Sequence, residues 1–370
     1  MEYLHNCQTY VGGTGLAINS PLYRKKSIQI HFFPLTLLLI ALSSYKLRDT
    51  NNDIFLIMEI LESISTFTLL MIRKYVVFTH SSLMLDIFND CYNLWSFDLF
   101  GLELEQKFKK QMKNCWTLAQ TLITCGFITI MFMCVSALIE EEKLVPFICW
   151  LPDFLYAREL IFLSQFIILM VVFYYILLTD GFYLLVCMDI KIQYKMMRKM
   201  LKSIKFGIIL EKESLEKLVE LAKHHNKMLK LHKKLNNVFS KYFLVQYAMS
   251  VSAITVQAYT LKYSEVTIET VLKSIFYTVS ILLQVALYFF PASNVEIEAS
   301  IIIIKLFILF FLNWQDYGNV KIRHHILFML LKSQQKLEMK GGGMLHINRN
   351  EYLMMFRLAL TIATLLGNLS

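Results

Sequence analysis

The chain has 370 residues, and 56% of them are hydrophobic. A soluble globular domain is usually about 45–50% apolar, so this composition indicates a membrane protein and excludes an ordinary soluble domain. The 37 lysines and arginines outnumber the 28 aspartates and glutamates, and this excess is informative mainly through where the basic residues lie.

The first 29 residues are mixed polar and contain nothing typical of a cleaved signal peptide. Within them, the run Gly12-Gly13-Thr14-Gly15 follows no predicted strand, which favours a flexible lead-in over a phosphate-binding loop. We therefore interpret residues 1–29 as a cytoplasmic N-terminal arm.

Seven apolar stretches approach the length of about 20 residues that crosses a membrane as a helix. They are Ile30–Tyr45, Ile54–Ile72, Cys115–Ile139, Glu159–Met188, Tyr242–Leu261, Val271–Pro291 and Asn350–Leu366. A further run, Ile301–Leu312, has only twelve residues and includes Lys305, so we expect a buried or interfacial helix there. If this run did span, the C-terminus would change sides.

Basic residues concentrate on one side of the predicted spans. They lie in the N-terminal arm, between the second and third spans, and most densely from Lys191 to Lys241 between the fourth and fifth. Because positive residues favour the cytoplasmic side, the N-terminus is predicted inside and the C-terminus outside. The opposite side carries the acidic run Glu140–Glu142, which either attracts cations to a pore mouth or is merely solvated.

The two long cytoplasmic loops have the apolar period of helices. In the first loop the repeating positions are Leu218, Val219, Ala222, Met228, Leu229, Leu235, Val238 and Phe239, and in the second Phe311, Trp314, Tyr317, Phe328 and Leu331. Such helices either lie on lipid headgroups or pack together, and we favour a packed base because the second leads into the final span. Residues 30–291 then hold six membrane helices, 292–345 an anchor segment and 346–370 the final helix.

No pattern in the sequence supports catalysis, and we predict neither an enzyme nor a cofactor, metal or nucleic-acid site. The chain lacks GxSxG, HExxH and a glycine-rich phosphate loop after a strand. The histidines at 224, 225 and 232 and at 324 and 325 lie among lysines on amphipathic helices, so we favour a solvated face over a metal site. The seven cysteines have no CxxC spacing, and we interpret most of them as small apolar residues rather than as a disulfide framework.

Two carboxylates, Glu59 and Glu62, lie one turn apart in the second span, where a charge usually faces the bundle interior or a water-filled cavity. Either they anchor a ligand, or they are neutralised or paired within the bundle. A pocket for a small apolar ligand needs aromatic and methionine side chains with a few polar groups. In the outer half of the bundle the candidates are Met58, Glu62, Ser65, Phe127, Met131, Cys134, Gln165, Leu169, Tyr277 and Ile281.

The final helix carries polar residues on one face, at Asn350, Arg357, Thr361, Thr364 and Asn368. A polar stripe is unfavourable against lipid, and copies from several subunits arranged around an axis would let it line a pore. Leu365 and Leu369, one turn apart, would then form a hydrophobic constriction that gates by dewetting. In the alternative, Thr361, Thr364 and Asn368 hydrogen-bond a neighbouring helix.

The sequence resembles the insect odorant receptor family, most specifically near its end. The residues that carry the likeness are Ser300, Trp314-Gln315-Asp316-Tyr317, Leu331-Lys332-Ser333-Gln334-Gln335 and the closing segment from Phe356 to Leu366. The stretch from Phe147 to Asp153 is similar to the aromatic-proline patch of the family's second outer loop. Ile362, Ala363 and Gln315 depart from residues that are common in the family, and the closing tail differs from that of the co-receptor.

The resemblance implies an all-α membrane protein with seven transmembrane helices, a cytoplasmic N-terminus, an extracellular C-terminus and cytoplasmic anchor helices. It also implies a tuning subunit that binds a small volatile and assembles with a shared co-receptor into a heterotetrameric, non-selective cation channel in the plasma membrane of sensory dendrites. By this resemblance Leu365 and Leu369 fall at the gate and Asn368 near the polar mouth. The alternatives are a gustatory-type chemosensory channel, or a membrane transporter or metabotropic receptor.

Overall fold

The computed structural model of the chain describes residues 26–50, 54–139, 145–204, 211–263, 268–312, 320–334 and 337–369. These residues are almost entirely helical. The long helices are α2 (Lys26–Lys46), α3 (Ile54–Tyr92), α4 (Leu102–Ile139), α5 (Ala157–Ser203), α6 (Glu211–Tyr263), α7 (Ile268–Leu312), α8 (Val320–Ser333) and α9 (Arg349–Leu369). Two short 3-10 helices, η1 (Leu47–Asp49) and η2 (Phe97–Phe100), and a hairpin of β1 (Lys340–Gly341) and β2 (Leu345–His346) complete the structure.

Each of the seven predicted spans lies inside one helix, so the all-α prediction is confirmed. The helices are nevertheless much longer than the spans. α6 has 53 residues, which at about 1.5 Å per residue is about 80 Å, whereas the hydrocarbon core of a bilayer is about 30 Å thick. By length and composition alone, Ser274–Phe307 is the one stretch within the described ranges that could cross a membrane.

Two sequence-based boundaries are wrong. The amphipathic loop helix and the fifth span form a single helix, α6, and the run Ile301–Leu312 continues α7 instead of forming a separate element. Pro291 lies inside α7 without ending it, because a proline removes only one backbone hydrogen bond and a long packed helix absorbs that loss. The hairpin was not predicted, since its strands have two residues each.

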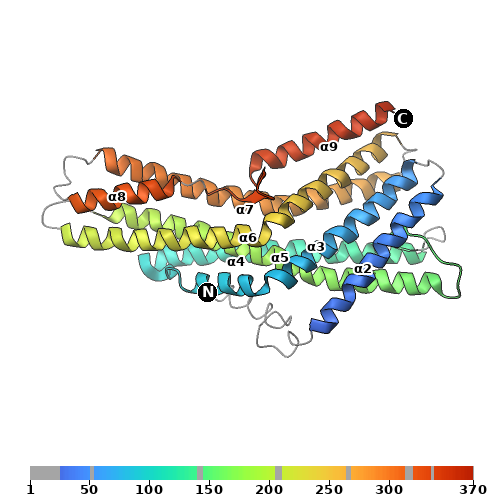
Figure 1. Cartoon of the computed structure of the whole chain (residues 1–370). Helices are drawn as coiled ribbons and strands as arrows, with labels where there is room; N and C mark the ends of the chain where they lie inside the picture. The colour runs from blue at the N-terminus through green and yellow to red at the C-terminus, as the bar shows by residue number, and fades with distance from the viewer. Residues whose placement is uncertain are drawn as a thin grey trace.

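The helices form one elongated bundle with two distinguishable ends (Figure 1). α8 packs beside α7 and α6 at one end, and α9 runs along α6 toward the other, where α2 packs against α3. The β1–β2 hairpin packs on α6 between them. We call the end with α8 the α8 half and the end with α2 and α9 the α9 half.

The main hydrophobic core fills the α8 half and the middle of the bundle. Its aromatic side chains contact one another edge to face, as in the Phe88–Phe182 pair with ring centroids 4.9 Å apart and the Tyr183–Phe239 pair at 5.1 Å. A smaller core in the α9 half surrounds Phe67 and Phe147, whose centroids are 5.2 Å apart. The predicted apolar face of the first amphipathic segment packs into the main core as part of α6. On α8 the predicted face is wrong, because Phe328 and Leu331 are 59% and 56% exposed, and Ile326 and Met329 are buried instead.

The solvated face predicted for the first histidine group is wrong. His224, His225 and His232 are 3%, 3% and 6% exposed. His224 stacks on Trp95 with the ring centroids 3.8 Å apart, so the aromatic face of the imidazole, rather than its charge, determines where it lies. Among the described residues no group of histidine, cysteine and carboxylate side chains could hold a metal ion.

Other predictions fall outside the described residues or agree with them. Residues 1–25, the acidic run at 140–142 and the motif at 314–317 lie outside the ranges given above. Several cysteines are buried and form no disulfide, as the apolar interpretation expects: Cys91, Cys115, Cys134, Cys149 and Cys187.

Candidate functional site: a cavity between five helices

A cavity of about 260 Å³ lies among α3, α4, α5, α6 and α7 in the α9 half of the bundle. Pockets for drug-sized ligands usually enclose about 300–1,000 Å³, so this one suits a smaller molecule. Phe147, from the segment between α4 and α5, also lines it. The cavity exists partly because Gly181 sits in the wall of α5, where an added Cβ would meet no atom within 4 Å.

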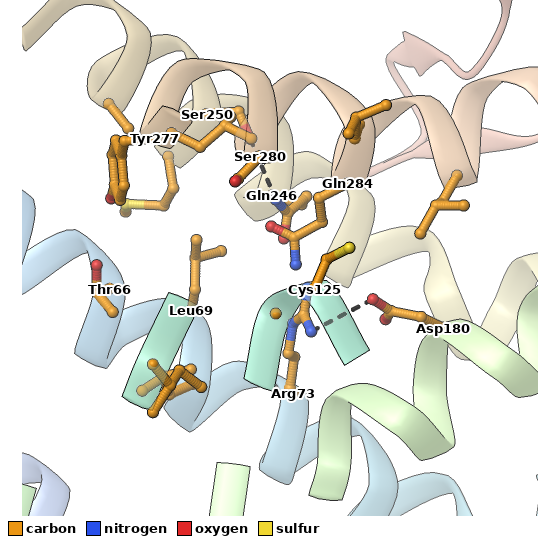
Figure 2. A pocket seen from close by; sticks show the side chains of 18 of the residues that line it. Thr66, Leu69, Arg73, Cys125, Asp180, Gln246, Ser250, Tyr277, Ser280 and Gln284 are labelled. Atoms are coloured by element: carbon orange, nitrogen blue, oxygen red, sulfur yellow. Dashed lines mark hydrogen bonds and ion pairs between the residues drawn. The ribbon is translucent and has the colours of Figure 1, made fainter. Parts of the chain in front are cut away.

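Most of the cavity wall is apolar, and its polar groups are divided between the surroundings of Arg73 and the opposite side, where Thr66 and Tyr277 lie (Figure 2). The apolar residues are Leu69, Leu70, Ala119, Cys125, Ile130, Phe147, Leu169, Leu184, Met249, Ala253, Ile281, Leu283 and Leu287. The polar groups that converge in Figure 2 include Arg73, Asp180, Gln246 and Ser250, supplied by α3, α5 and α6. A few polar groups in an apolar cavity can orient a ligand that is otherwise held by shape.

A buried ion pair forms one end of this polar group. Arg73 Nη1 lies 3.5 Å from Asp180 Oδ2, and the two side chains are 1% and 6% exposed. The Asp180 carboxylate also accepts hydrogen bonds from the Tyr288 hydroxyl and from Thr179 Oγ1, the latter at 2.9 Å. The pair links α3 to α5. Separating the two helices here is unfavourable, because each would keep a buried charge without its counter-charge.

A row of polar contacts continues from the ion pair along α6. Tyr288 gives its hydroxyl hydrogen to Asp180, and its oxygen lies 2.9 Å from the Tyr242 hydroxyl oxygen. Tyr242 gives its own hydrogen to Gln246 Oε1 at 2.9 Å. Gln246 Nε2 in turn donates to Ser250 Oγ at 3.1 Å, the bond drawn at the top of Figure 2. These contacts fix the amide of Gln246 in the cavity wall.

Four of the residues predicted for a pocket line the cavity: Ser65, Leu169, Tyr277 and Ile281. They come from three helices, α3, α5 and α7, so the structure brings together positions far apart in the sequence. These residues were proposed because each has an apolar or weakly polar side chain inside a predicted span. Most residues of the cavity wall share that property.

The remaining predicted pocket residues lie elsewhere. Glu62 is outside the lining, and its Oε2 accepts a hydrogen bond from Gln257 Nε2 at 3.0 Å, while Glu59 is exposed. Phe127 is 36% exposed and Met131 is half-buried. Cys134 is buried in the smaller core, and the side chain of Met58 is outside the described residues.

Gln165 is a special case, because it acts on the lining without belonging to it. Its Oε1 accepts from the Phe147 backbone N–H at 3.0 Å, and its Nε2 donates to the Phe147 carbonyl at 2.9 Å. This buried amide therefore holds the backbone of a residue that does line the cavity.

The predicted pore helix, α9, packs on α6 along a single line. Met355, Ala359 and Ala363 are buried, and Thr255 of α6 donates a hydrogen bond to the Ala359 carbonyl at 3.2 Å. The polar positions lie away from this line: the exposed residues of the stripe are Asn350, Arg357, Thr361 and Thr364. Leu365 is 57% exposed, and the side chains of Asn368 and Leu369 are outside the described residues.

The two threonines of the stripe bond within their own helix. Thr361 Oγ1 donates to the Arg357 carbonyl at 2.9 Å, and Thr364 Oγ1 donates to the Thr361 carbonyl at 2.7 Å. These bonds satisfy the hydroxyl donors without a neighbouring helix. The threonines thus remain on the exposed face of α9.

Sequence reasoning missed the charged pair. The predicted second span ends at Ile72, so the sequence places Arg73 in the basic loop that follows, whereas α3 continues to Tyr92. The available signal was Asp180, a carboxylate inside the longest apolar stretch, because an acid in a membrane span usually has a partner. Its partner could not be read from spacing, since Arg73 lies 107 positions away.

Comparisons with known proteins agree with this architecture. A family model described as 7tm Odorant receptor matches residues 54–360. The fold is similar to that of the insect olfactory receptor OR5 from Machilis hrabei, with a TM-score of 0.80, 15% identity and 100% of both chains covered. The structure of that receptor in complex with eugenol matches with a TM-score of 0.80, 14% identity and the same coverage. At these identities the likeness shows the fold alone, and no curated protein sequence matches the chain.

Proposed function

The chain belongs to the odorant receptor family, and we propose that it is the odorant-binding subunit of a ligand-gated, non-selective cation channel. The observation that carries the proposal is the largely apolar cavity between the five helices, which has the size and lining that a small volatile requires. The insect receptor of the same fold has been solved in complex with eugenol, a small odorant, which supports the same class of ligand here.

In this proposal the exposed face of α9 lines the pore. A lone helix cannot enclose a channel, but four subunits around an axis can bring four such faces together. Its support is that α9 buries one line on α6 and leaves the polar stripe uncovered. Leu365 and Leu369 are the proposed hydrophobic gate, with Thr361, Thr364 and Asn368 beside them on the ion path.

The channel is proposed to be a heterotetramer with the shared co-receptor of the family, in the plasma membrane of a sensory dendrite. Its N-terminus would lie in the cytoplasm and its C-terminus outside, as the distribution of basic residues predicts. Residues 292–345 would then belong to a cytoplasmic anchor, and α8 with the adjoining ends of α6 and α7 would form its packed base.

The first experiment fills the cavity and leaves the rest of the bundle unchanged. Gly181→Leu adds a side chain where a Cβ meets open space, so we expect the chain to fold and reach the surface while its half-maximal odorant concentration rises about tenfold or more. The measurement is the odorant-evoked current of the chain co-expressed with the co-receptor, over a broad panel of volatiles.

Ser252→Leu is the control, since it introduces the same leucine side chain at an exposed position of α6. Equal dose–response curves for the two variants would remove the cavity from odorant binding. Absence of any current from a surface-expressed complex would refute the proposed function. Currents without the co-receptor would indicate a homomeric channel.

The gate is tested separately. Leu365→Ala or Leu369→Ala removes bulk from the proposed constriction, so basal current should rise in the absence of odorant. Leu353→Ala is a control on the same helix, exposed like Leu365 but three turns earlier. Unchanged basal current in both gate variants would refute the assignment.

A further inference from the structure

One hydrogen-bond donor in the polar part of the cavity has no partner. Arg73 is 1% exposed, and its Nη2 makes no hydrogen bond to any residue within the described ranges. A buried donor without an acceptor is unfavourable, more so on a charged group. Because Arg73 lines the cavity, a molecule bound there can supply the missing acceptor. Figure 2 shows its side chain rising from α3 toward the middle of the cavity.

Two of the polar groups around Arg73, the Asp180 carboxylate and the Gln246 amide, already have partners. The Asp180 carboxylate accepts from Thr179, Tyr288 and Arg73 Nη1. The Gln246 amide uses its oxygen with Tyr242 and its nitrogen with Ser250. Of these three groups, the guanidinium is the one with a hydrogen-bond donor left over.

The charges that line the cavity restrict which ligand groups can accept a hydrogen bond from Arg73 Nη2. Asp180 Oδ2 lies 3.5 Å from Arg73 Nη1, so the two opposite charges offset each other. A ligand carboxylate would gain from Arg73 but would also lie close to Asp180 in a poorly screened site. A neutral oxygen gains the hydrogen bond without that repulsion.

We propose that the cavity selects neutral volatiles with a carbonyl oxygen on an apolar body, namely ketones, aldehydes and esters. Arg73 Nη2 donates a hydrogen bond to the carbonyl oxygen, and the apolar body lies against Leu69, Ile130, Leu169 and Ile281. A carbonyl fits better than a hydroxyl, because a hydroxyl brings a donor of its own that needs a further acceptor. This inference rests on the proposed function, since it assigns a ligand class to the same cavity.

Direct binding tests the inference apart from channel activity. The full chain is purified in lipid nanodiscs, and the ligand-induced rise of its thermal unfolding midpoint is followed against ligand concentration. The probes share an aromatic body and differ in the polar group: acetophenone, ethylbenzene and benzoate. Hexanal and hexane repeat the comparison on a linear chain.

We expect each carbonyl compound to bind about tenfold or more tightly than its hydrocarbon, as for a hydrogen bond to a charged group, and more tightly than benzoate. The double variant Arg73→Met with Asp180→Asn removes the donor and its counter-charge together, so that no buried charge is left alone. In this variant the preference for carbonyl compounds should disappear while hydrocarbon binding persists. Lys241→Met is the control, since it removes an exposed positive charge outside the cavity.

Two results would overturn the inference: equal binding of carbonyl compound and hydrocarbon, or a preference that survives in the double variant. Tighter binding of benzoate than of acetophenone would overturn the neutral ligand class. Failure of the proposed function is recognised differently, by volatiles that bind to the nanodisc protein but evoke no current from the surface-expressed complex.

Discussion

Helix α5 is buried in two different ways along its length, and the contrast separates the two halves of the molecule. From Thr179 to Met197 nearly every side chain is buried or half-buried, whereas from Ala157 to Met170 buried positions recur on one side and exposed apolar ones occupy the other. A helix buried all round lies at the centre of a bundle, and one with a single buried side lies at its margin.

The same contrast holds for the neighbouring helices. In the α9 half, large apolar side chains such as Ile128, Leu138 and Phe276 are more than half exposed, which suits contact with lipid rather than water. The α8 half has basic residues outside and the main core inside. We infer that the α8 half supplies most of the stability, while the α9 half, with its cavity, is the part that can respond to a ligand.

The largest effect is expected from Phe88→Ala. Phe88 is 0% exposed in the main core and packs edge to face on Phe182. Its truncation should lower the free energy of unfolding by about 3–5 kcal/mol, through lost burial and the cavity left behind. Thermal unfolding of the purified chain measures this, with Phe276→Ala, 69% exposed, as the control. Similar losses for both variants would erase the distinction between the halves.

Next in size is the acid sensitivity of the α8 half. Burial, aided by the positive charge of Lys227, lowers the pKa of His224 from 6.5 to about 3, and burial lowers the pKa of His232 to about 4. The folded chain therefore binds protons less readily than the unfolded chain. Stability that is complete above pH 6.5 should fall as the pH drops toward 4, by up to about 1.4 kcal/mol per pH unit for each histidine.

His232→Leu tests this effect, because it replaces a buried imidazole whose Nε2 has no hydrogen-bond partner among the described residues. When the pH is lowered from 7 to about 4.5, the thermal unfolding midpoint of the variant should fall by less than that of the parent. His324→Gln, at an exposed position, is the control and should follow the parent. Parallel pH curves for all three proteins would show that buried histidines do not set acid stability.

In the α9 half, Gln165→Leu should loosen the wall of the cavity. The change leaves the buried N–H and C=O of Phe147 without their side-chain partner, at about 1–3 kcal/mol for each group. Because Phe147 lines the cavity, Gln165→Leu should lower odorant sensitivity. This loss of sensitivity should exceed that of a variant in the main core with the same loss of stability. Leu201→Ala, in the α8 half, is the comparison of similar cost. Equal losses of odorant sensitivity in Gln165→Leu and Leu201→Ala would show that Gln165 affects the cavity only through overall stability.

The sequence predicts the helices well because apolar runs and helical periods are local properties of the chain. It does not predict that α6 joins an amphipathic segment to an apolar span. The composition changes from basic to apolar partway along α6, but the helix continues without a break. Ser65 and Tyr277 could be proposed for the cavity from their type and depth, whereas the Arg73–Asp180 pair depends on how α3 and α5 are packed. The burial of His224 likewise depends on Trp95, a residue from a different part of the chain.

The smallest effect concerns the hairpin that joins the two halves and leads into α9. Gly342 has a φ of +59°, its N–H donates to the Ser240 carbonyl at 2.9 Å, and an added Cβ would lie 2.5 Å from Leu244 Cδ2. Gly343 has a φ of +78° with nothing within 4 Å. Alanine is strained at both positions, by about 1 kcal/mol, but only at Gly342 must it also push against α6.

Gly342→Ala should therefore unfold at a lower temperature than Gly343→Ala, and the difference isolates the contact with Leu244 from the backbone strain that both variants share. Because the hairpin holds the start of α9 on α6, Gly342→Ala should also shift the basal current, whereas Gly343→Ala should not. A pair of variants that are alike in both measurements would mean that the hairpin can move on α6 without disturbing α9. The two halves would then be joined only by the long helices that run through both of them, such as α3, α5 and α6.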